Sequence, residues 1–318
     1  MGNQLSVFFP PAPSFTEASL PDLRNKVYIV TGASAGVGKE LSRLLYSRNG
    51  TVYLTARSFE KAKAAIAWIK EQHPSSQGKL SYLYLELNDL EGIKTSAATF
   101  LAQESRLDVL FNNAGIMGTP KGGKTKQGYE EHLGVNCVAP FLFTKLLTPL
   151  LRATAEKEEK KGSVRVVWVS SMAAFLAAPS GGIDMRNLDY KKDAWQTAKY
   201  GISKGGNILH ALEYRRRYGG DGIVSITLHP GNLDSELSRH LSSWQYLMAK
   251  ALLYPPVYGA YTELFAGLAP EGATLKESEW VLPWGRVVKL RKDFYSDKGK
   301  DNAKAFWEWS EKQVERFT

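Results

Sequence analysis

Short apolar runs alternate with longer helical patterns along most of the chain, from about residue 26 onward. The apolar runs predict strands at 27–31, 51–55, 80–85, 107–111, 164–170 and 223–229. The intervening patterns predict helices at 36–47, 59–72, 89–104, 128–151 and 200–218. Strands separated by helices of this length pair in parallel through crossover connections. We therefore expect a doubly wound α/β sheet with helices on both faces.

Beyond residue 232 the alternation loosens, although helices are still expected at 258–269 and, as a C-terminal extension, at 301–317. An apolar stripe at helical spacing precedes them, made of Trp244, Leu247, Met248, Ala251 and Leu252. It predicts either a lid over a substrate site, spanning about 232–256, or a helix of the core. Because no linker-like composition divides the chain, we expect one domain over 26–318 after an arm of residues 1–25.

Composition fits a folded protein, since 43% of the residues are hydrophobic and 11% are aromatic. The net charge is +9, but the basic residues are scattered among acids. This pattern favours a solvated surface that attracts phosphorylated cofactors or anionic membranes over nucleic-acid binding. The single cysteine, Cys137, excludes an intramolecular disulfide and a cysteine-based metal site. It lies in the apolar run V-N-C-V-A-P-F, which favours buried packing.

The first residues, M-G-N-Q-L-S-V-F-F, lack the basic start and apolar core of a signal peptide. They match the myristoylation pattern through Gly2 and Ser6, and they also fit an arm whose Phe8 and Phe9 pack on the domain. No run of about 18 apolar residues is present, so no membrane-spanning segment is expected. We expect a cytoplasmic protein, with contact at a membrane surface left open.

A glycine-rich turn joins the first expected strand to the first expected helix, with the sequence T-G-A-S-A-G-V-G over 31–38. Glycine permits the tight turn and lets a pyrophosphate approach the backbone at a helix N-terminus. The residues expected to bind a dinucleotide here are Gly32, Ser34, Ala35, Gly36, Val37 and Gly38. The position directly after a valine-rich strand favours a Rossmann-type site.

Tyr200 and Lys204 lie four residues apart in Y-G-I-S-K. On a helix, residues at this spacing share a face, so the phenol and the ammonium can converge on one ligand. The pair follows a strand ending in V-S-S and precedes one ending in H-P-G. A second match, Tyr246 and Lys250, lacks such flanks and is not expected to be catalytic.

Together these motifs resemble the short-chain dehydrogenase/reductase family, over about residues 26–269. The segments that carry the resemblance are T-G-A-S-A-G-V-G-K-E, V-Y-L-T-A-R, N-N-A-G, V-N-C-V-A-P-F, V-S-S-M-A, Y-G-I-S-K-G-G-N-I-L and H-P-G-N-L-D-S-E-L. Within the family the chain looks most similar to the retinol-dehydrogenase-like branch, and to fungal members in particular.

The resemblance implies a catalytic tetrad of Asn136, Ser171, Tyr200 and Lys204. Tyr200 would donate the proton to a carbonyl oxygen that receives a hydride. The Lys204 charge, with that of the oxidised nicotinamide, is expected to lower the tyrosine pKa. Ser171 would orient the substrate oxygen, and Asn136 would bend its helix and hold a water in a proton relay.

The resemblance also extends the cofactor site. Further contacts are expected from Glu86, Leu87, Asn113, Ala114, Gly115, Pro230, Gly231, Leu233 and Ser235. Glu86 departs from the family's aspartate at the adenine edge, and Ser235 stands where the family carries threonine. Asp89 is expected to cap the next helix.

NADP(H) is the expected cofactor because the second strand ends in L-T-A-R-S, without the carboxylate that NAD-binding members place there. Arg57 is positioned to bind a 2′-phosphate, although an exposed loop arginine has the same sequence appearance.

The chain is thus expected to interconvert a ketone or aldehyde and an alcohol on a hydrophobic small molecule of polyketide, steroid, retinoid or other secondary-metabolite type. The alternative is a catalytically silent NADP-binding regulatory or scaffold protein. The insert between Ser171 and Tyr200 would form either a substrate rim or an inert surface excursion. Substrate identity, reaction direction and oligomeric state stay open.

Overall fold

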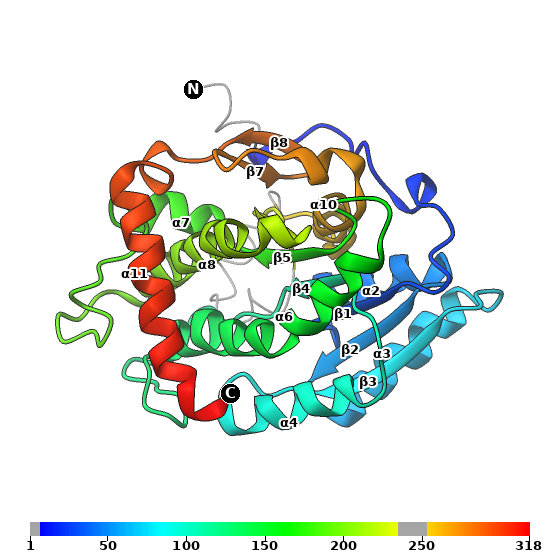
Figure 1. The fold of residues 1–318 in the computed structure, drawn as a ribbon, viewed down its shortest axis with the longest axis horizontal. Coiled ribbons are helices and arrows are strands. Elements are labelled where there is room, and N and C mark those ends of the chain that lie inside the picture. Colours follow the sequence, from blue (N-terminus) through cyan, green and yellow to red (C-terminus); the bar gives the residue numbers. More distant parts are fainter. Residues whose placement is uncertain (1–6, 235–252) are drawn as a thin grey trace.

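The computed structural model describes residues 7–234 and 253–318, which form one eight-stranded sheet (Figure 1). The strand order is β3-β2-β1-β4-β5-β6-β7-β8, and the pairs from β3 to β7 are parallel. The strands are β1 (Val27–Val30), β2 (Thr51–Ala56), β3 (Lys79–Tyr84), β4 (Val109–Asn112), β5 (Arg165–Val169), β6 (Val224–Leu228), β7 (Glu279–Leu282) and β8 (Arg286–Lys289). Chain order reverses between β1 and β4, where doubly wound sheets form a ligand crevice beyond the carboxyl ends of their strands. The expected doubly wound α/β sheet is confirmed.

Helices cover both faces of the sheet and enclose two apolar clusters. One face carries α4 (Leu90–Leu101), α6 (Ala139–Lys157) and α8 (Gln196–Tyr218). The other carries α2 (Gly36–Ser47), α3 (Phe59–Gln72) and α10 (Pro256–Leu268). The remaining elements are η1 (Glu17–Ser19), α5 (Glu131–Leu133), η2 (Gly134–Val138), α7 (Met172–Ala177), η3 (Gly219–Asp221), η5 (Pro270–Thr274), η6 (Lys292–Phe294), α11 (Asp297–Val314) and η7 (Glu315–Phe317).

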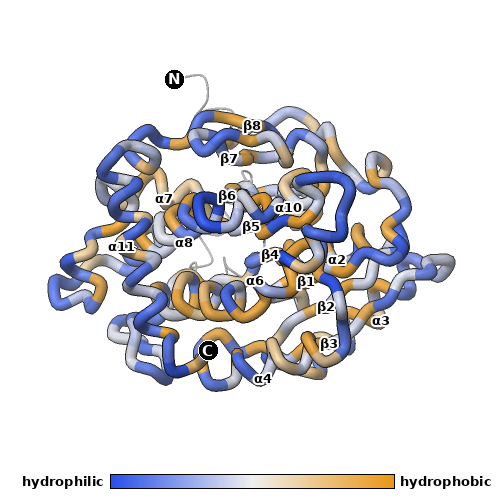
Figure 2. Tube along the Cα trace, in the orientation of Figure 1, coloured by the Kyte–Doolittle hydropathy of each residue, from blue (hydrophilic) through white to orange (hydrophobic). Residues whose placement is uncertain are grey.

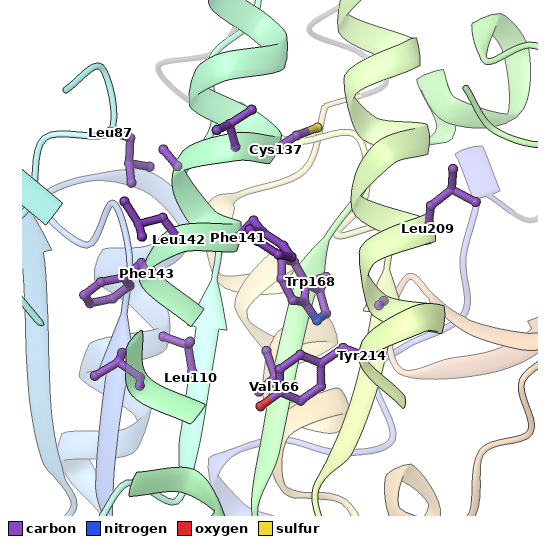
Figure 3. Close-up of a cluster of buried hydrophobic side chains, with 14 of the residues drawn as sticks. Leu87, Leu110, Cys137, Phe141, Leu142, Phe143, Val166, Trp168, Leu209 and Tyr214 are labelled. Carbon is purple, nitrogen blue, oxygen red and sulfur yellow. The ribbon is translucent and has the colours of Figure 1, made fainter. Parts of the chain in front are cut away.

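Aromatic residues fill the core between the sheet and helices α6 and α8. Figure 3 shows Phe141 of α6, Trp168 of β5 and Tyr214 of α8 in this cluster. The Trp168 ring is buried while its Nε1 donates a hydrogen bond to Ser225 Oγ at 3.1 Å, which satisfies its polar atom. Figure 2 shows hydrophobic residues concentrated in the middle of the molecule and hydrophilic residues on the peripheral loops.

The C-terminal helix α11 packs against α8, and this contact is close because of a glycine. A Cβ atom at Gly206 of α8 would lie 3.0 Å from the Phe306 ring and 2.8 Å from Cys137 Sγ. The His210 ring of α8 stacks on Phe306, and its Nε2 lies 3.0 Å from Ser310 Oγ. The C-terminal helix therefore covers the outer face of α8.

The sequence missed two strands and the short helix α7, and it placed the starts of α8 and α11 four residues late. β7 and β8 form an antiparallel hairpin that ends the sheet, with Gly285 at a φ of +90° in its turn. β7 joins β6 through the single pair Leu228 and Val281. The sequence predicted that this helix begins at Tyr200. Helix α8 begins at Gln196, so Tyr200 lies in its second turn. The N-cap prediction for α4 is confirmed, since Asp89 Oδ1 accepts a hydrogen bond from the Glu91 amide.

The helix expected at 128–151 spans Glu131–Lys157 and contains one turn of π-helix, η2. Contrary to the expectation from apolar runs, this helix is long and apolar enough in composition to cross a membrane. In the protein, however, 78% of its most apolar window is buried, and it packs over the sheet next to α4 and α8. It is therefore a helix of the core.

Candidate active site

The glycine-rich turn and the loop after β4 meet at the point where strand order reverses. Asn113 Nδ2 donates to the Thr31 carbonyl at 2.6 Å, and the Ala114 amide donates to Thr31 Oγ1 at 2.9 Å. A Cβ atom at Gly38 would lie 2.6 Å from Asn113 Nδ2, so only glycine fits there. Gly32 adopts a φ of +66°, in the left-handed region that favours glycine.

The N-terminus of α2 is open to a ligand. Its cap residue, Ala35, makes no side-chain hydrogen bond, whereas Ser58 and Asp89 cap α3 and α4 with their side chains. The first amides of a helix have no intrahelical partner, and the helix dipole attracts anions to them. The turn can therefore hold a pyrophosphate against these amides.

Beside the turn lies a cavity of about 260 Å³ that contains most of the expected cofactor residues. Its lining residues are Gly32, Ser34, Ala35, Gly36, Val37, Gly38, Thr55, Ala56, Arg57, Leu85, Glu86, Leu87, Asn113, Ala114, Gly115, Ile116, Met117 and Val135. Arg57 is exposed, and no described residue forms an ion pair or hydrogen bond with its guanidinium. Glu86 instead turns its carboxylate back toward the chain, accepting a hydrogen bond from the Asn88 amide at 3.0 Å.

A second cavity, of about 370 Å³, contains the expected catalytic residues except Asn136. It shares Val37, Asn113 and Gly115 with the first cavity, so the two adjoin. Its lining residues among those described are Phe8, Val37, Asn113, Gly115, Val169, Ser170, Ser171, Tyr200, Lys204, His229, Pro230, Gly231, Asn232, Leu233 and Leu253. Segments from β5, α8 and the end of β6 are thus brought together beside the cofactor cavity.

Tyr200 and Lys204 lie side by side on α8, with Lys204 Nζ 5.9 Å from the centre of the Tyr200 ring. The Lys204 ammonium donates a hydrogen bond to the Val169 carbonyl at 2.8 Å, which fixes it at the end of β5. Burial lowers the pKa of Lys204 to about 8, and the nearby Cys137 and Glu263 side chains act against this fall. Desolvation thus weakens the binding of the proton, but at neutral pH the side chain is still mostly the charged ammonium.

Burial also raises the pKa of Tyr200 above its usual value, and a hydrogen bond with Ser171 acts against that rise. The sequence predicted a lowered tyrosine pKa from the Lys204 charge together with that of the oxidised nicotinamide. In the protein alone the pKa of Tyr200 is raised, because the phenol is desolvated and the Lys204 ammonium is bonded to Val169, and the lowered pKa stays a prediction for the protein with bound cofactor. Lowering the tyrosine pKa requires further positive charge near the phenol.

The two serines at the end of β5 have different surroundings. Ser171 caps α7 by accepting a hydrogen bond from the Ala173 amide at 3.1 Å, and it lines the catalytic cavity. Ser170 donates to the Lys204 carbonyl at 2.7 Å, so it ties α8 to β5. Both serines line the 370 Å³ cavity, but the Ser170 hydroxyl is bonded to the backbone of α8, so the contact of Ser171 with a substrate oxygen stays the prediction.

Asn136 lies in the π-helical turn η2 and links three segments. Its Oδ1 accepts from the Ile116 amide at 2.8 Å, and its Nδ2 donates to the Ile116 carbonyl and to Ser203 Oγ. Both amide hydrogens are therefore committed to protein acceptors. The residue braces the loop after β4 against α8, one residue away from Lys204.

Comparisons with known proteins agree with this geometry. Residues 26–183 match the family model described as short chain dehydrogenase. The chain is 51% identical to a short-chain dehydrogenase/reductase of Phomopsis amygdali, over 99% of this chain and 97% of that protein. It is 48% identical to the short-chain dehydrogenase/reductase pkfC of Emericella nidulans, over 98% and 99%.

The chain belongs to the short-chain dehydrogenase/reductase family. A crystal structure of an uncharacterized protein from Mycobacterium paratuberculosis superposes with a TM-score of 0.69 at 27% identity, covering 95% of this chain and 97% of the other. The Pseudomonas aeruginosa RhlG/NADP active-site complex has the same fold, with a TM-score of 0.64 at 22% identity, covering 84% and 96%.

Some expectations about this family member fall outside the described residues. These are Gly2 and Ser6, Ser235, the apolar stripe from Trp244 to Leu252, and the second tyrosine–lysine pair, Tyr246 and Lys250.

The insert between Ser171 and Tyr200 is firmly attached to the domain. Arg291 donates hydrogen bonds to four carbonyls at the end of α7 and just after it, those of Ala174, Phe175, Ala178 and Pro179. Among the described parts of the chain, residues 172–199 contribute nothing to the 370 Å³ cavity. Leu188, Tyr190 and Lys199 instead line a separate cavity of about 640 Å³.

Two buried titratable groups of this short-chain dehydrogenase/reductase lie near the site, of which sequence reasoning missed Glu263. Glu263 of α10 is fully buried, and neither carboxylate oxygen has a hydrogen-bond partner among the described residues. Burial raises its pKa to about 8, and the Lys204 charge acts against this rise. His229, which lines the catalytic cavity, is kept neutral because burial lowers its pKa to about 3. No motif marked Glu263, because its position depends on how α10 packs over the sheet.

Proposed function

We propose that this protein is an NADP(H)-dependent oxidoreductase that interconverts a ketone or aldehyde and an alcohol on a hydrophobic small molecule. The observation that carries the proposal is the convergence of Tyr200, Lys204 and Ser171 in one cavity that adjoins the glycine-turn cavity. A proton donor, a cation and a hydroxyl are the groups that carbonyl reduction requires beside a hydride source.

The residues around the glycine turn fit a dinucleotide. The open N-terminus of α2 would hold the pyrophosphate, and Leu87 and Glu86 border the space for the adenine. Asn113, Gly115, Pro230 and the nearby Leu233 would surround the nicotinamide end, with Ser235 as a further contact expected from sequence. When bound, the nicotinamide supplies the hydride for reduction or accepts it in oxidation.

The side chains of the 370 Å³ cavity would bind the substrate oxygen and transfer a proton to it or from it. Ser171 Oγ would hold the substrate oxygen by a hydrogen bond. Tyr200 would give its proton to that oxygen during reduction and take it back during oxidation. Lys204, fixed by the Val169 carbonyl, would stabilise the phenolate that remains after proton transfer. Asn136 would act by holding the Ile116 loop and Ser203 in place.

The preference for NADP(H) over NAD(H) rests on Arg57. Its exposed guanidinium borders the first cavity just after β2, and no described residue competes for it. A planar guanidinium suits bidentate hydrogen bonding to a phosphate.

The substrate class follows from the apolar part of the second cavity. Phe8, Val169, Leu233 and Leu253 line it together with the catalytic groups. The similar proteins of Phomopsis amygdali and Emericella nidulans are fungal, which supports a role in secondary metabolism. A polyketide, steroid, retinoid or similar carbonyl compound is therefore the proposed substrate, and the cytoplasm is the proposed location.

The test is a screen of purified protein for carbonyl-dependent oxidation of NADPH against sterol, retinoid, polyketide and aliphatic ketones and aldehydes. The Tyr200→Phe variant should bind NADPH with nearly unchanged affinity and lose several orders of magnitude in turnover, because only the proton donor is removed. Turnover above about a tenth of the wild-type rate would show that another group is the acid. NADPH binding without turnover of any carbonyl would favour the silent NADP-binding protein.

A further inference from the structure

The N-terminal arm reaches the catalytic cavity. Phe8 lines the 370 Å³ cavity together with Tyr200 and Ser171, although it lies almost two hundred residues from Tyr200 in sequence. Its neighbours in the chain differ sharply in exposure. Val7 is 2% exposed and belongs to the main apolar cluster, whereas Phe9 is 67% exposed. The Phe8 side chain is 41% exposed, which is intermediate between these two neighbours.

A hydrogen bond fixes the arm at this place. Tyr254 Oη donates to the Phe8 carbonyl at 3.2 Å. Tyr254 is itself held by a short β-bridge to Leu233, in which its amide donates to Asn232 and its carbonyl accepts from Asp234, both at 2.9 Å. The arm is therefore attached to the chain just after β6, in a segment that also lines the cavity.

Two independent anchors thus determine where the Phe8 ring lies: the buried Val7 side chain before it and the Tyr254 hydroxyl on its backbone. Leu233 and Leu253 are further apolar residues that line this cavity. A ring held in this way removes water from one side of the cavity and offers apolar surface to a ligand.

We propose that the N-terminal arm is part of the substrate site, with Phe8 as an apolar wall that selects substrates by size and hydrophobicity. The inference deepens the proposed function and rests on it for the identity of the ligand as a carbonyl compound. The position of Phe8 in the cavity does not depend on that function, so the two can be tested separately.

The first test needs no substrate and uses the full-length chain. The only native cysteine, Cys137, is fully buried, so a new cysteine supplies the accessible thiol. Alkylation by iodoacetamide is measured for Phe8→Cys and, as the matched control, Phe9→Cys, each with and without saturating NADPH. NADPH should slow the reaction several-fold at position 8, because it fills the adjoining space, and leave position 9 unchanged.

Once a fluorescence titration has shown that each variant binds NADPH, equal rates with and without it at position 8, or equal protection at both positions, would overturn the proposal. As a control, thermal unfolding of both cysteine variants is measured to check that they are folded. If Phe8→Cys has a lower Tm than the wild type, the proposal is tested instead with Phe8→Leu. The kinetic test below then measures the effect of that substitution on substrate selectivity.

The second test measures selectivity with acetophenone and 2-acetylnaphthalene as a small and a large aryl ketone. Phe8→Ala should shift the ratio of their kcat/KM values about tenfold toward the larger ketone, since a lost apolar contact changes discrimination on that scale. Phe8→Leu should shift it less, and Phe9→Ala should leave it unchanged. An unshifted ratio in Phe8→Ala contradicts the wall. Failure of the wild type to reduce either ketone or any screened carbonyl counts against the proposed function, and the alkylation result then decides the inference.

Discussion

Replacing Glu263 by glutamine should stabilise the protein, and more so as the pH rises. The native carboxyl is fully buried, no residue in the described part of the chain forms a hydrogen bond with it, and its pKa rises from an ordinary value of 4.5 to about 8. A raised native pKa means that the folded state keeps a proton that the unfolded state releases. The contribution of this carboxyl to the free energy of unfolding is therefore fully present below pH 4.5, and it is lost progressively as the pH rises to 8.

The interval from 4.5 to about 8 corresponds to about 5 kcal/mol, at about 1.4 kcal/mol for each pH unit. Glutamine has nearly the shape of the protonated carboxyl and does not titrate, so Glu263→Gln should match the wild type near pH 4.5 and exceed it above pH 8. For a chain of 318 residues, about 5 kcal/mol corresponds to about 7 °C in Tm.

The assay is thermal unfolding of wild type and variant in a pH series from 4.5 to 9. Glu213→Gln is the matched control, because Glu213 is also a buried glutamate but is paired with Arg216 and Arg217. That variant loses ion pairs and should lower Tm. A Tm difference between Glu263→Gln and wild type that stays constant over the pH series would refute the reasoning. It would show that ionisation of Glu263 does not destabilise the protein.

Other variants test further parts of the structure. Arg57→Ala should weaken NADP(H) by about 1.5–3 kcal/mol and NAD(H) much less, as measured by fluorescence titration; equal losses would exclude a 2′-phosphate contact. Asn136→Ala leaves the Ile116 amide without its acceptor and should lower both stability, by about 2 kcal/mol, and kcat, whereas unchanged kinetics would limit Asn136 to a structural role. Arg291→Ala leaves several carbonyls after α7 unpaired and should lower the free energy of unfolding by about 3 kcal/mol in urea titrations; a loss below about 0.5 kcal/mol would show that water replaces the guanidinium.

Features that depend on local sequence were predictable. The parallel strands follow from short apolar runs separated by helices, and the glycine turn follows from the backbone conformation that residues such as Gly32 must adopt. The pair Tyr200 and Lys204 follows from helical periodicity, even though α8 begins at Gln196. In each case residues close in sequence carry the information.

Features that depend on distant contacts were not predictable. The β7–β8 hairpin consists of four-residue strands, E-W-V-L and R-V-V-K, in which polar and apolar residues do not alternate in sequence, although burial alternates along β8. The unpaired carboxyl of Glu263 results from the packing of α10, and the position of Phe8 results from a bond to Tyr254. The raised pKa of Tyr200 reflects desolvation, which a sequence motif does not report.

The close packing of α11 on α8 has a consequence for quaternary structure. The contact at Gly206 leaves no space between α8 and Phe306, and His210 stacks on the same ring. A second copy of the chain could reach this face of α8 only by displacing α11. The helix that carries Tyr200 and Lys204 is thus supported on its outer face by its own polypeptide.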